Sequence, residues 1–368
     1  MKQSTFRDFS ETKEVAEYFD KQEENQTSKV HKFSSVKEKI KNLDLGPKPY
    51  FLPVLAGSTP YWKHPSVLVS WDRLPPVKQR LPYDYNKTLI MVESGGYLED
   101  NKPSTQEECM MKQMRIHPDL CLVLDFPVKI KSVGKGRELA ERRRTFLLPE
   151  SEKIKLIQKT IDSAKFAMEH KEKLEELWNH IFEPVAIIHS YDKKSLVWCT
   201  EELFSLGYEF FCIGGISTDV AARNVQDILS MLDIVRSIIG EGTWIHLLGI
   251  TELRILKRVT TNEDQSNLSS FMNSETNDED DTKGFVELLT ETKDLVNSFD
   301  SASITWQAAY AKLILPDGSA TSLGKGRKAL GERYADLYPR DASGYMKLQE
   351  INFSNFMEYL HSNLWKDK

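Results

Sequence analysis

Short apolar segments recur along this chain, and most of them stop at glycine, serine, histidine or an acidic residue. Such segments predict buried β-strands, and the stretches between many of them have apolar residues at helical spacing. Regular alternation of strand and helix favours an α/β fold in which the strands close into a (β/α)8 TIM barrel, rather than a doubly wound open sheet. We predict barrel strands at residues 50–55, 66–70, 88–92, 120–124, 184–188, 210–213, 243–248 and in the run that ends at Asp300.

The segments outside this pattern divide the chain. Residues 1–45 are polar and rich in lysine and glutamate, which predicts a peripheral N-terminal arm with some helix. The barrel is expected over residues 46–312, with an acidic insert at 262–283 whose composition is typical of a disordered loop. Residues 313–368 predict a small C-terminal α+β extension. Helices are expected at residues 151–170, 196–206, 224–239, 284–297 and 352–364.

Cysteine spacing and the lack of targeting segments indicate the cellular compartment that the sequence favours. The four cysteines, Cys109, Cys121, Cys199 and Cys212, are far apart and form no C-x-x-C pair. This spacing argues against a disulfide framework or a cysteine-rich zinc site and favours a reducing cytoplasm. The polar N-terminus does not resemble a signal peptide, and no apolar run is long enough to predict a membrane span. The net charge is -6, and the acidic insert accounts for all of it.

Basic residues gather in two glycine-containing stretches. Residues 129–144 carry a net charge of +5, and the sequence Gly-Lys-Gly-Arg within them recurs at 324–327. Glycine beside basic residues lets backbone amides approach phosphates, so both stretches are candidate contacts to a nucleic-acid backbone. A solvated helix start is the alternative for the first stretch. The candidate residues are Lys135, Arg137, Arg142, Arg143, Arg144, Lys325 and Arg327.

Three acidic residues follow or end predicted strands. In a barrel of parallel strands, Glu93, Asp125 and Asp300 would meet at the rim where such folds keep their chemistry. A carboxylate that attacks a sugar carbon, together with a second acid that manages a proton, is the requirement for glycosyl transfer. Alternatively, Asp300 followed by serine is a turn or a helix N-cap. His189 and His246, also near strand ends, could be hydrogen-bonded core or rim groups.

The order of these motifs resembles the queuine/archaeosine tRNA-guanine transglycosylases, (β/α)8 enzymes that exchange guanine for a 7-deazaguanine base. The resemblance implies that Asp300 is the nucleophile and Glu93 the acid–base residue. It further implies that Asp125 hydrogen-bonds the base and that the Gly214 and Gly215 backbone lines its pocket. Ser94 and Gly95 are further base-binding candidates, and Leu247, Tyr97 or Phe126 could cover the face of the base. The motifs are Phe51-Leu52-Pro53-Val54, Glu93-Ser94-Gly95-Gly96-Tyr97, Pro118-Asp119-Leu120 through Asp125, Ile213-Gly214-Gly215, His246-Leu247-Leu248-Gly249 and Phe299-Asp300-Ser301-Ala302-Ser303.

Two departures from the family pattern refine this expectation. Glu93 stands where the family usually has aspartate, and no cysteine follows Cys212, so the family's zinc site is missing and no metal or cofactor is expected. The chain is therefore most similar to the divergent branch that inserts 7-deazaguanines into DNA. The sequence predicts a pentosyltransferase acting on DNA, with tRNA as the alternative substrate. A catalytically silent nucleic-acid-binding subunit, in a homodimer or beside an active paralogue, remains the competing hypothesis.

Overall fold

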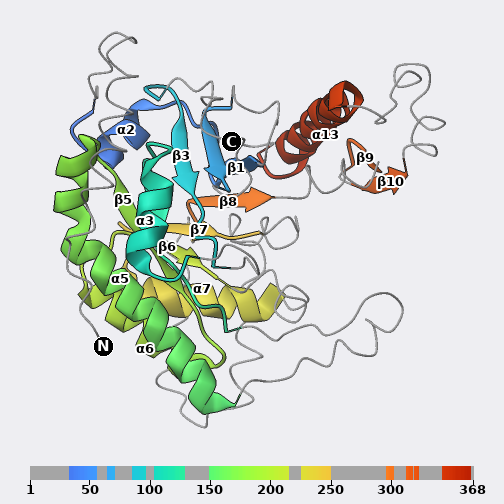
Figure 1. Ribbon diagram of the computed structural model, residues 1–368. Helices are drawn as coiled ribbons and strands as arrows, with labels where there is room; N and C mark the ends of the chain where they lie inside the picture. Colours follow the sequence, from blue (N-terminus) through green and yellow to red (C-terminus); the bar gives the residue numbers. More distant parts are fainter. Residues whose placement is uncertain are drawn as a thin grey trace.

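Eight parallel strands close into a barrel in the computed structural model of this chain (Figure 1). The structure describes residues 33–55, 64–70, 85–96, 103–128, 149–214, 225–249, 296–301, 312–317, 319–322 and 342–365. The strands follow one another around the barrel in sequence order, and β8 returns to pair with β1. The predicted (β/α)8 architecture is therefore confirmed.

The strands lie where the apolar segments predicted them. They are β1 (Tyr50–Leu55), β2 (Ser66–Val69), β3 (Leu89–Val92), β4 (Leu120–Leu122), β5 (Glu183–Ile188), β6 (Phe210–Ile213), β7 (Trp244–Leu247) and β8 (Ser298–Ser301). All residues of β2, β3, β4, β6 and β7 are buried. Strands covered on both faces lack the alternation of half-exposed strands, and this explains their uninterrupted apolar sequence. Each leucine or isoleucine buried in this way contributes about 1.5–3 kcal/mol.

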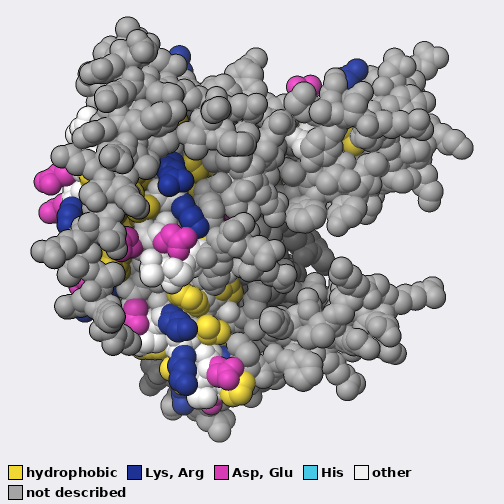
Figure 2. Space-filling view, viewed as in Figure 1, with side chains coloured by type: hydrophobic (Ala, Val, Ile, Leu, Met, Phe, Trp, Pro, Cys, Tyr) yellow, Lys and Arg dark blue, Asp and Glu magenta, His cyan; other side chains and the backbone are white. Residues whose placement is uncertain are grey.

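Helices cover the outside of the barrel. The main ones are α3 (Gln106–Met114), α5 (Glu150–Trp178), α6 (Lys193–Ser205) and α7 (Val225–Ile239). Consecutive helices α5, α6 and α7 lie side by side, and α3 packs on α5 (Figure 1). Helix α5 continues past the predicted end at 170 to Trp178, where Asn179 adopts a left-handed conformation with φ of 45°. Basic and acidic side chains are interspersed along its exposed side (Figure 2).

The described part of the N-terminal arm is attached to the barrel by a buried ion pair near the start of β4. Helix α2 (Val36–Asn42) buries Lys39, whose ammonium lies 2.6 and 2.7 Å from the two carboxylate oxygens of Asp119. Asp119 precedes β4 and also accepts a hydrogen bond from the Ile90 amide. Burial raises the pKa of the Asp119 carboxyl, and the Lys39 ammonium opposes that shift. This part of the arm is therefore attached at the end of the barrel opposite the carboxyl ends of the strands.

The C-terminal extension joins a two-stranded antiparallel sheet to a long helix. The elements are β9 (Lys312–Ile314), β10 (Ala320–Ser322) and α13 (Ala342–Asn363). Helix α13 begins ten residues before the predicted start at 352. Its Asn352 accepts from the Ile314 amide at 2.7 Å, and Asn355 donates to the Ile314 carbonyl at 2.7 Å. These two amide side chains satisfy the backbone of β9 and thereby tie this sheet to α13.

A further predicted helix boundary is wrong. The helix expected at 284–297 was to extend to Asn297, but Val296 and Asn297 are non-helical and lead directly into β8. The Asn297 side chain accepts from the Ile245 amide at 2.8 Å and from the Arg236 guanidinium at 3.0 Å. Residues 284–295 and the acidic insert lie outside the described residues. Among the helices that the structure does describe, none has the length and apolar character needed to cross a membrane.

Candidate functional site

The carboxyl ends of the barrel strands bring together several of the predicted site residues. Because the strands are parallel, the segments after β3, β4, β5 and β6 open at the same mouth as the end of β8. Glu93, Ser94, Gly95, Asp125, Gly214, Leu247 and Asp300 all fall within the described residues. Gly215 and the seven basic candidates Lys135, Arg137, Arg142, Arg143, Arg144, Lys325 and Arg327 lie outside them.

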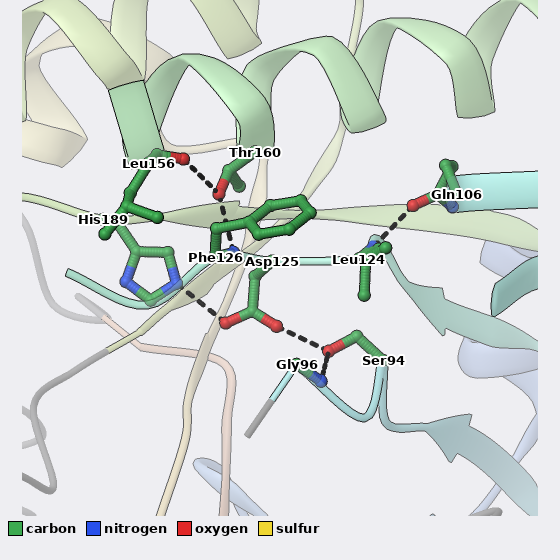
Figure 3. Close-up of polar contacts among 9 residues, drawn as sticks. All are labelled: Ser94, Gly96, Gln106, Leu124, Asp125, Phe126, Leu156, Thr160 and His189. Carbon is green, nitrogen blue, oxygen red and sulfur yellow. Dashed lines mark hydrogen bonds and ion pairs between the residues drawn. The ribbon is translucent and has the colours of Figure 1, made fainter. Parts of the chain in front are cut away.

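Asp125 is the centre of one buried polar cluster (Figure 3). It follows β4 and is 1 % exposed. Its Oδ1 accepts from the Ser94 hydroxyl at 2.6 Å, and its Oδ2 lies 2.8 Å from Nε2 of His189. A carboxylate can only accept, so Nε2 of His189 carries the proton in this contact. Ser94 in turn accepts from the Gly96 amide at 3.0 Å, within the loop after β3. The Ser94–Asp125 hydrogen bond ties this loop to the segment after β4.

Two glycines allow this cluster to close. A Cβ atom on Gly96 would lie 2.0 Å from Oδ1 of Asp125, and one on Gly214 would lie 2.5 Å from Cε1 of His189. Both distances are far below any ordinary contact, so a side chain at either position would displace the acid or the imidazole. Gly95 has φ of 73°, a left-handed conformation that favours glycine. The glycines after β3 and β6 therefore shape the walls around Asp125.

Amide and hydroxyl side chains hold the neighbouring backbone. Gln106 of α3 accepts from the Leu124 amide at 2.5 Å, and Thr160 of α5 accepts from the Phe126 amide at 3.0 Å (Figure 3). Gln113 donates to the Leu122 carbonyl at 2.7 Å and to the Glu93 carbonyl at 3.0 Å. These contacts satisfy backbone groups where the strand pairing ends, and thereby fix the segments that carry Glu93 and Asp125.

Asp300 is the centre of a second buried cluster. It lies inside β8 and is 4 % exposed. Its Oδ1 accepts from the Gly249 amide at 2.7 Å and lies 3.1 Å from Nε2 of His246. Both partners come from β7 or the turn after it, so in its described contacts Asp300 acts as a strand residue and not as a helix cap. Within the described part of the chain, the carboxylate is thus held against β7 through a single oxygen.

Cys212 connects the two clusters electrostatically. It lies on β6 between β5 and β7, and its register partners are Ile187 and His246. Burial raises the pKa of the Cys212 thiol well above its usual range, and the carboxylates of Asp300 and Asp125 raise it further. Both acids therefore lie close enough to act on one thiol. Because burial and both acids keep the Cys212 thiol protonated, it is not a nucleophile itself.

The remaining predicted residues have different surroundings. Glu93 is partly exposed, and its Oε2 accepts from the Ser70 hydroxyl at 2.8 Å. Leu247 is completely buried and lies beside Phe299 in the β7–β8 register, which places its side chain in the core. Leu248, the next residue, is partly buried. Of the three predicted acids, Glu93 is therefore the accessible one.

The structure adds functional candidates that residue types alone did not assign. His189 and His246 each contact a buried aspartate, whereas the sequence left open whether they were core or rim groups. Their position at the ends of β5 and β7 was the available signal. Gly96 stood in the motif after β3, but its close approach to Asp125 could not be read from the sequence. Ser298 had no signal of its own, because its role follows from the strand register.

The geometry defines what this site can do. At the carboxyl ends of the strands the site holds two buried carboxylates, each paired with an imidazole, and a partly exposed glutamate. The described residues contain no group of three or more His, Cys, Asp or Glu side chains arranged to hold a metal ion. The chain matches none of the models of known protein families, and no curated protein matches its sequence significantly.

Proposed function

We propose that this chain is a glycosyltransferase that exchanges guanine in a nucleic acid for a 7-deazaguanine base through a covalent Asp300 intermediate. The observation that supports it best is the state of Asp300, a buried carboxylate whose described contacts all fall on Oδ1. The second buried acid, Asp125, lies close enough to influence the same thiol, Cys212. The resemblance of the strand-end motifs to the guanine transglycosylases supplies the substrate class.

The proposed reaction has two balanced displacements at the sugar carbon C1′. In the first, an Asp300 oxygen forms a bond to C1′ while the bond from C1′ to N9 of guanine breaks, and the leaving base takes up a proton. In the second, N9 of the incoming base loses a proton and attacks C1′, and the aspartate leaves as a carboxylate. Glu93 supplies and receives the proton, since it is the partly exposed acid of the site.

Asp125 is assigned to the base. Its two oxygens accept from Ser94 and His189, and an ionised carboxylate can accept more than two hydrogen bonds, so a base N–H is a donor that suits it. The Gly214 backbone lies against the His189 ring, beside the acid assigned to the base. The polar edge of a purine would then be read by groups that are already fixed in place, which lowers the entropy lost on binding.

DNA is the favoured substrate and tRNA the alternative. The preference for DNA depends on the sequence after residue 212, which contains no cysteine for the family's zinc site. A catalytically silent subunit is the second candidate function, and the Glu93 departure from the family pattern favours it. A silent subunit would bind nucleic acid without exchanging a base, so binding and exchange must be measured separately.

The decisive experiment tests the covalent bond. Wild-type protein mixed with DNA or tRNA in the absence of an incoming base should leave a protein–nucleic acid adduct that survives denaturation. Asp300→Asn should leave none and should lose base exchange by several orders of magnitude, while its nucleic-acid affinity persists. Asp317→Asn, at an exposed turn in the C-terminal sheet, is the matched control and should behave as wild type. Near-normal exchange by Asp300→Asn would refute the proposal.

Two further variants separate the candidate functions. Glu93→Gln should still form the adduct slowly but turn it over poorly, because the proton carrier is lost. Neutralising Arg142, Arg143 and Arg144 together should flatten the salt dependence of binding, by roughly one log–log unit for each phosphate that is no longer neutralised. Binding with this salt dependence but no adduct on either nucleic acid would favour the silent subunit.

A further inference from the structure

A column of buried polar side chains leads up to the Asp300 carboxylate along β7 and β8. His246 lies beside Ser298 in the register of the two strands, and Trp244 and Asp300 are each two residues away. Alternate residues of a strand face the same side, so all four side chains share one face. Trp244 is 7 % exposed, and His246 and Ser298 are completely buried. Every link below the acid therefore lies in the protein interior.

The contacts in this column form an unbroken series. Trp244 Nε1 lies 2.9 Å from the Ser298 hydroxyl, which lies 2.8 Å from Nδ1 of His246. Nε2 of the same ring lies 3.1 Å from Oδ1 of Asp300. Among the residues that the structure describes, the Ser298 hydroxyl has these two side-chain partners, one on each side.

The chemistry of the first link sets the direction of all the others. An indole N–H can only donate, so the Ser298 oxygen accepts from Trp244. The serine proton then has Nδ1 of His246 as its acceptor, which requires that Nδ1 carry no hydrogen. Nε2 must therefore hold the ring proton, and it donates that proton to Asp300. The alternative, a proton on Nδ1, would leave the serine proton without an acceptor in a buried site, at a cost in free energy.

We propose that His246 is a positioning residue for the nucleophile, held by Trp244 and Ser298 as the neutral Nε2–H tautomer. This inference rests on the proposed function and assigns a task to the second imidazole of the site. Two donors, His246 Nε2–H and the Gly249 amide, converge on Oδ1 of Asp300. They select Oδ2 as the oxygen that attacks C1′. A neutral donor also leaves the acid its full negative charge, whereas an imidazolium would weaken it as a nucleophile.

The same two donors act most strongly in the second displacement. While Oδ2 is bonded to C1′, Oδ1 is an uncharged ester carbonyl and its hydrogen bonds are ordinary ones. When the bond from Oδ2 to C1′ breaks, its electron pair returns to the carboxylate, and hydrogen bonds to a charged acceptor are stronger. His246 therefore assists the departure of Asp300 more than its attack. Removing the donor should slow release of the adduct more than its formation.

The tautomer can be measured without any substrate. Long-range proton–nitrogen spectra of protein labelled with ¹⁵N-histidine distinguish a protonated from an unprotonated ring nitrogen, and His246→Gln identifies the signal among the eight histidines. We expect an unprotonated Nδ1 and a protonated Nε2 at neutral pH. Ser298→Ala removes the donor to Nδ1 and should change that signal while His189 keeps its own. A protonated Nδ1 in the wild-type protein would overturn the inference.

The catalytic consequence is tested with single-turnover kinetics. His246→Leu should slow adduct release about ten- to hundred-fold, the effect of removing one hydrogen bond to a charged group. His246→Gln, whose amide can donate to Oδ1, should recover most of that activity, which a merely structural role would not predict. If His246→Leu released the adduct at the wild-type rate, the proposed role of His246 would be overturned. If the wild-type protein forms no adduct, the proposed function fails and this role with it, even where the spectra show the expected tautomer.

Discussion

Gly214→Ala should damage the site without touching any polar group. The new Cβ would lie 2.5 Å from Cε1 of His189 and 3.0 Å from both ring nitrogens. Ordinary contact between such atoms begins near 3.5 Å, so the ring or the backbone must move by about 1 Å. His189 cannot yield freely, because its Nε2 is bonded at 2.8 Å to the buried Asp125.

The expected cost has two parts. Overpacking a closely packed interior costs about 1–3 kcal/mol. Stretching a hydrogen bond to a buried carboxylate by about 1 Å forfeits most of its value, about 1.5–3 kcal/mol. We therefore expect Gly214→Ala to lower the free energy of unfolding by about 2–5 kcal/mol, since partial relaxation makes the two parts less than additive.

Urea denaturation of a small variant set tests this. Gly242→Ala is the matched control, because a Cβ there meets nothing within 4 Å, and it should change stability by less than about 0.5 kcal/mol. In a His189→Ala background the obstructing ring is gone, so Gly214→Ala should become nearly neutral, with a coupling energy of about 1–3 kcal/mol. Additive effects in this cycle, or equal costs at positions 214 and 242, would refute the steric reasoning.

Three stability predictions concern titratable side chains outside the candidate site. Lys39→Met should lower the free energy of unfolding by about 3–5 kcal/mol, because it leaves Asp119 buried without its cation. Lys37→Met, at an exposed ion pair, is the control and should lower it by less than about 1 kcal/mol in the same denaturation assay. Burial lowers the pKa of His64 to about 4, so between pH 6.5 and 4 the unfolded chain binds a proton at this residue and the folded protein does not. The free energy of unfolding should therefore fall by about 3 kcal/mol as the pH drops from 6.5 to 4. A stability difference between wild type and His64→Leu that stays flat over that range would contradict this. Burial raises the pKa of Asp233 to about 6, so Asp233→Asn should stabilise the protein by about 1–3 kcal/mol at pH 7, with the gain vanishing as the pH falls from 6 towards 4.

The barrel could be predicted because its strands are short apolar runs, most of which end at glycine, serine, histidine or an acidic residue. Leu68 and Ile90 sit in four-residue strands that are buried on both faces, and such strands appear in the sequence as uninterrupted apolar runs. The error at 284–297 has a different origin. Asn297 is fixed by the Ile245 amide and by Arg236, which are distant in sequence. Tertiary contacts of this kind override local helical periodicity, and no short window of sequence contains them.

The acids of the site were easier to predict than their partners. Asp125 and Asp300 stand out because acidic residues at the ends of several predicted barrel strands would meet at one rim, whereas a single such acid is often a turn residue or a helix N-cap. Their imidazole partners are separated from them by 64 and 54 positions in the sequence. That pairing depends on the register of neighbouring strands, and a shift of one residue would turn His246 away from Asp300. The sequence could nominate the histidines but could not pair them.

The two aspartate–histidine pairs have the same chemistry but different freedom, and this difference argues for their separate roles. Asp125 has both oxygens engaged, one by Ser94 and one by His189, and its surroundings admit no Cβ at Gly96. An acid bound at both oxygens is a rigid acceptor and a poor nucleophile, which suits recognition of a base. Among the described residues, the partners of Asp300 bind Oδ1 alone, so Oδ2 can form a new bond without first breaking one of these contacts. If the roles were exchanged, whichever Asp125 oxygen attacked would compete with its hydrogen bond to Ser94 or His189 at each turnover. In the proposed reaction, the asymmetry of the hydrogen bonds, more than the presence of two acids, therefore favours Asp300 as the attacking acid.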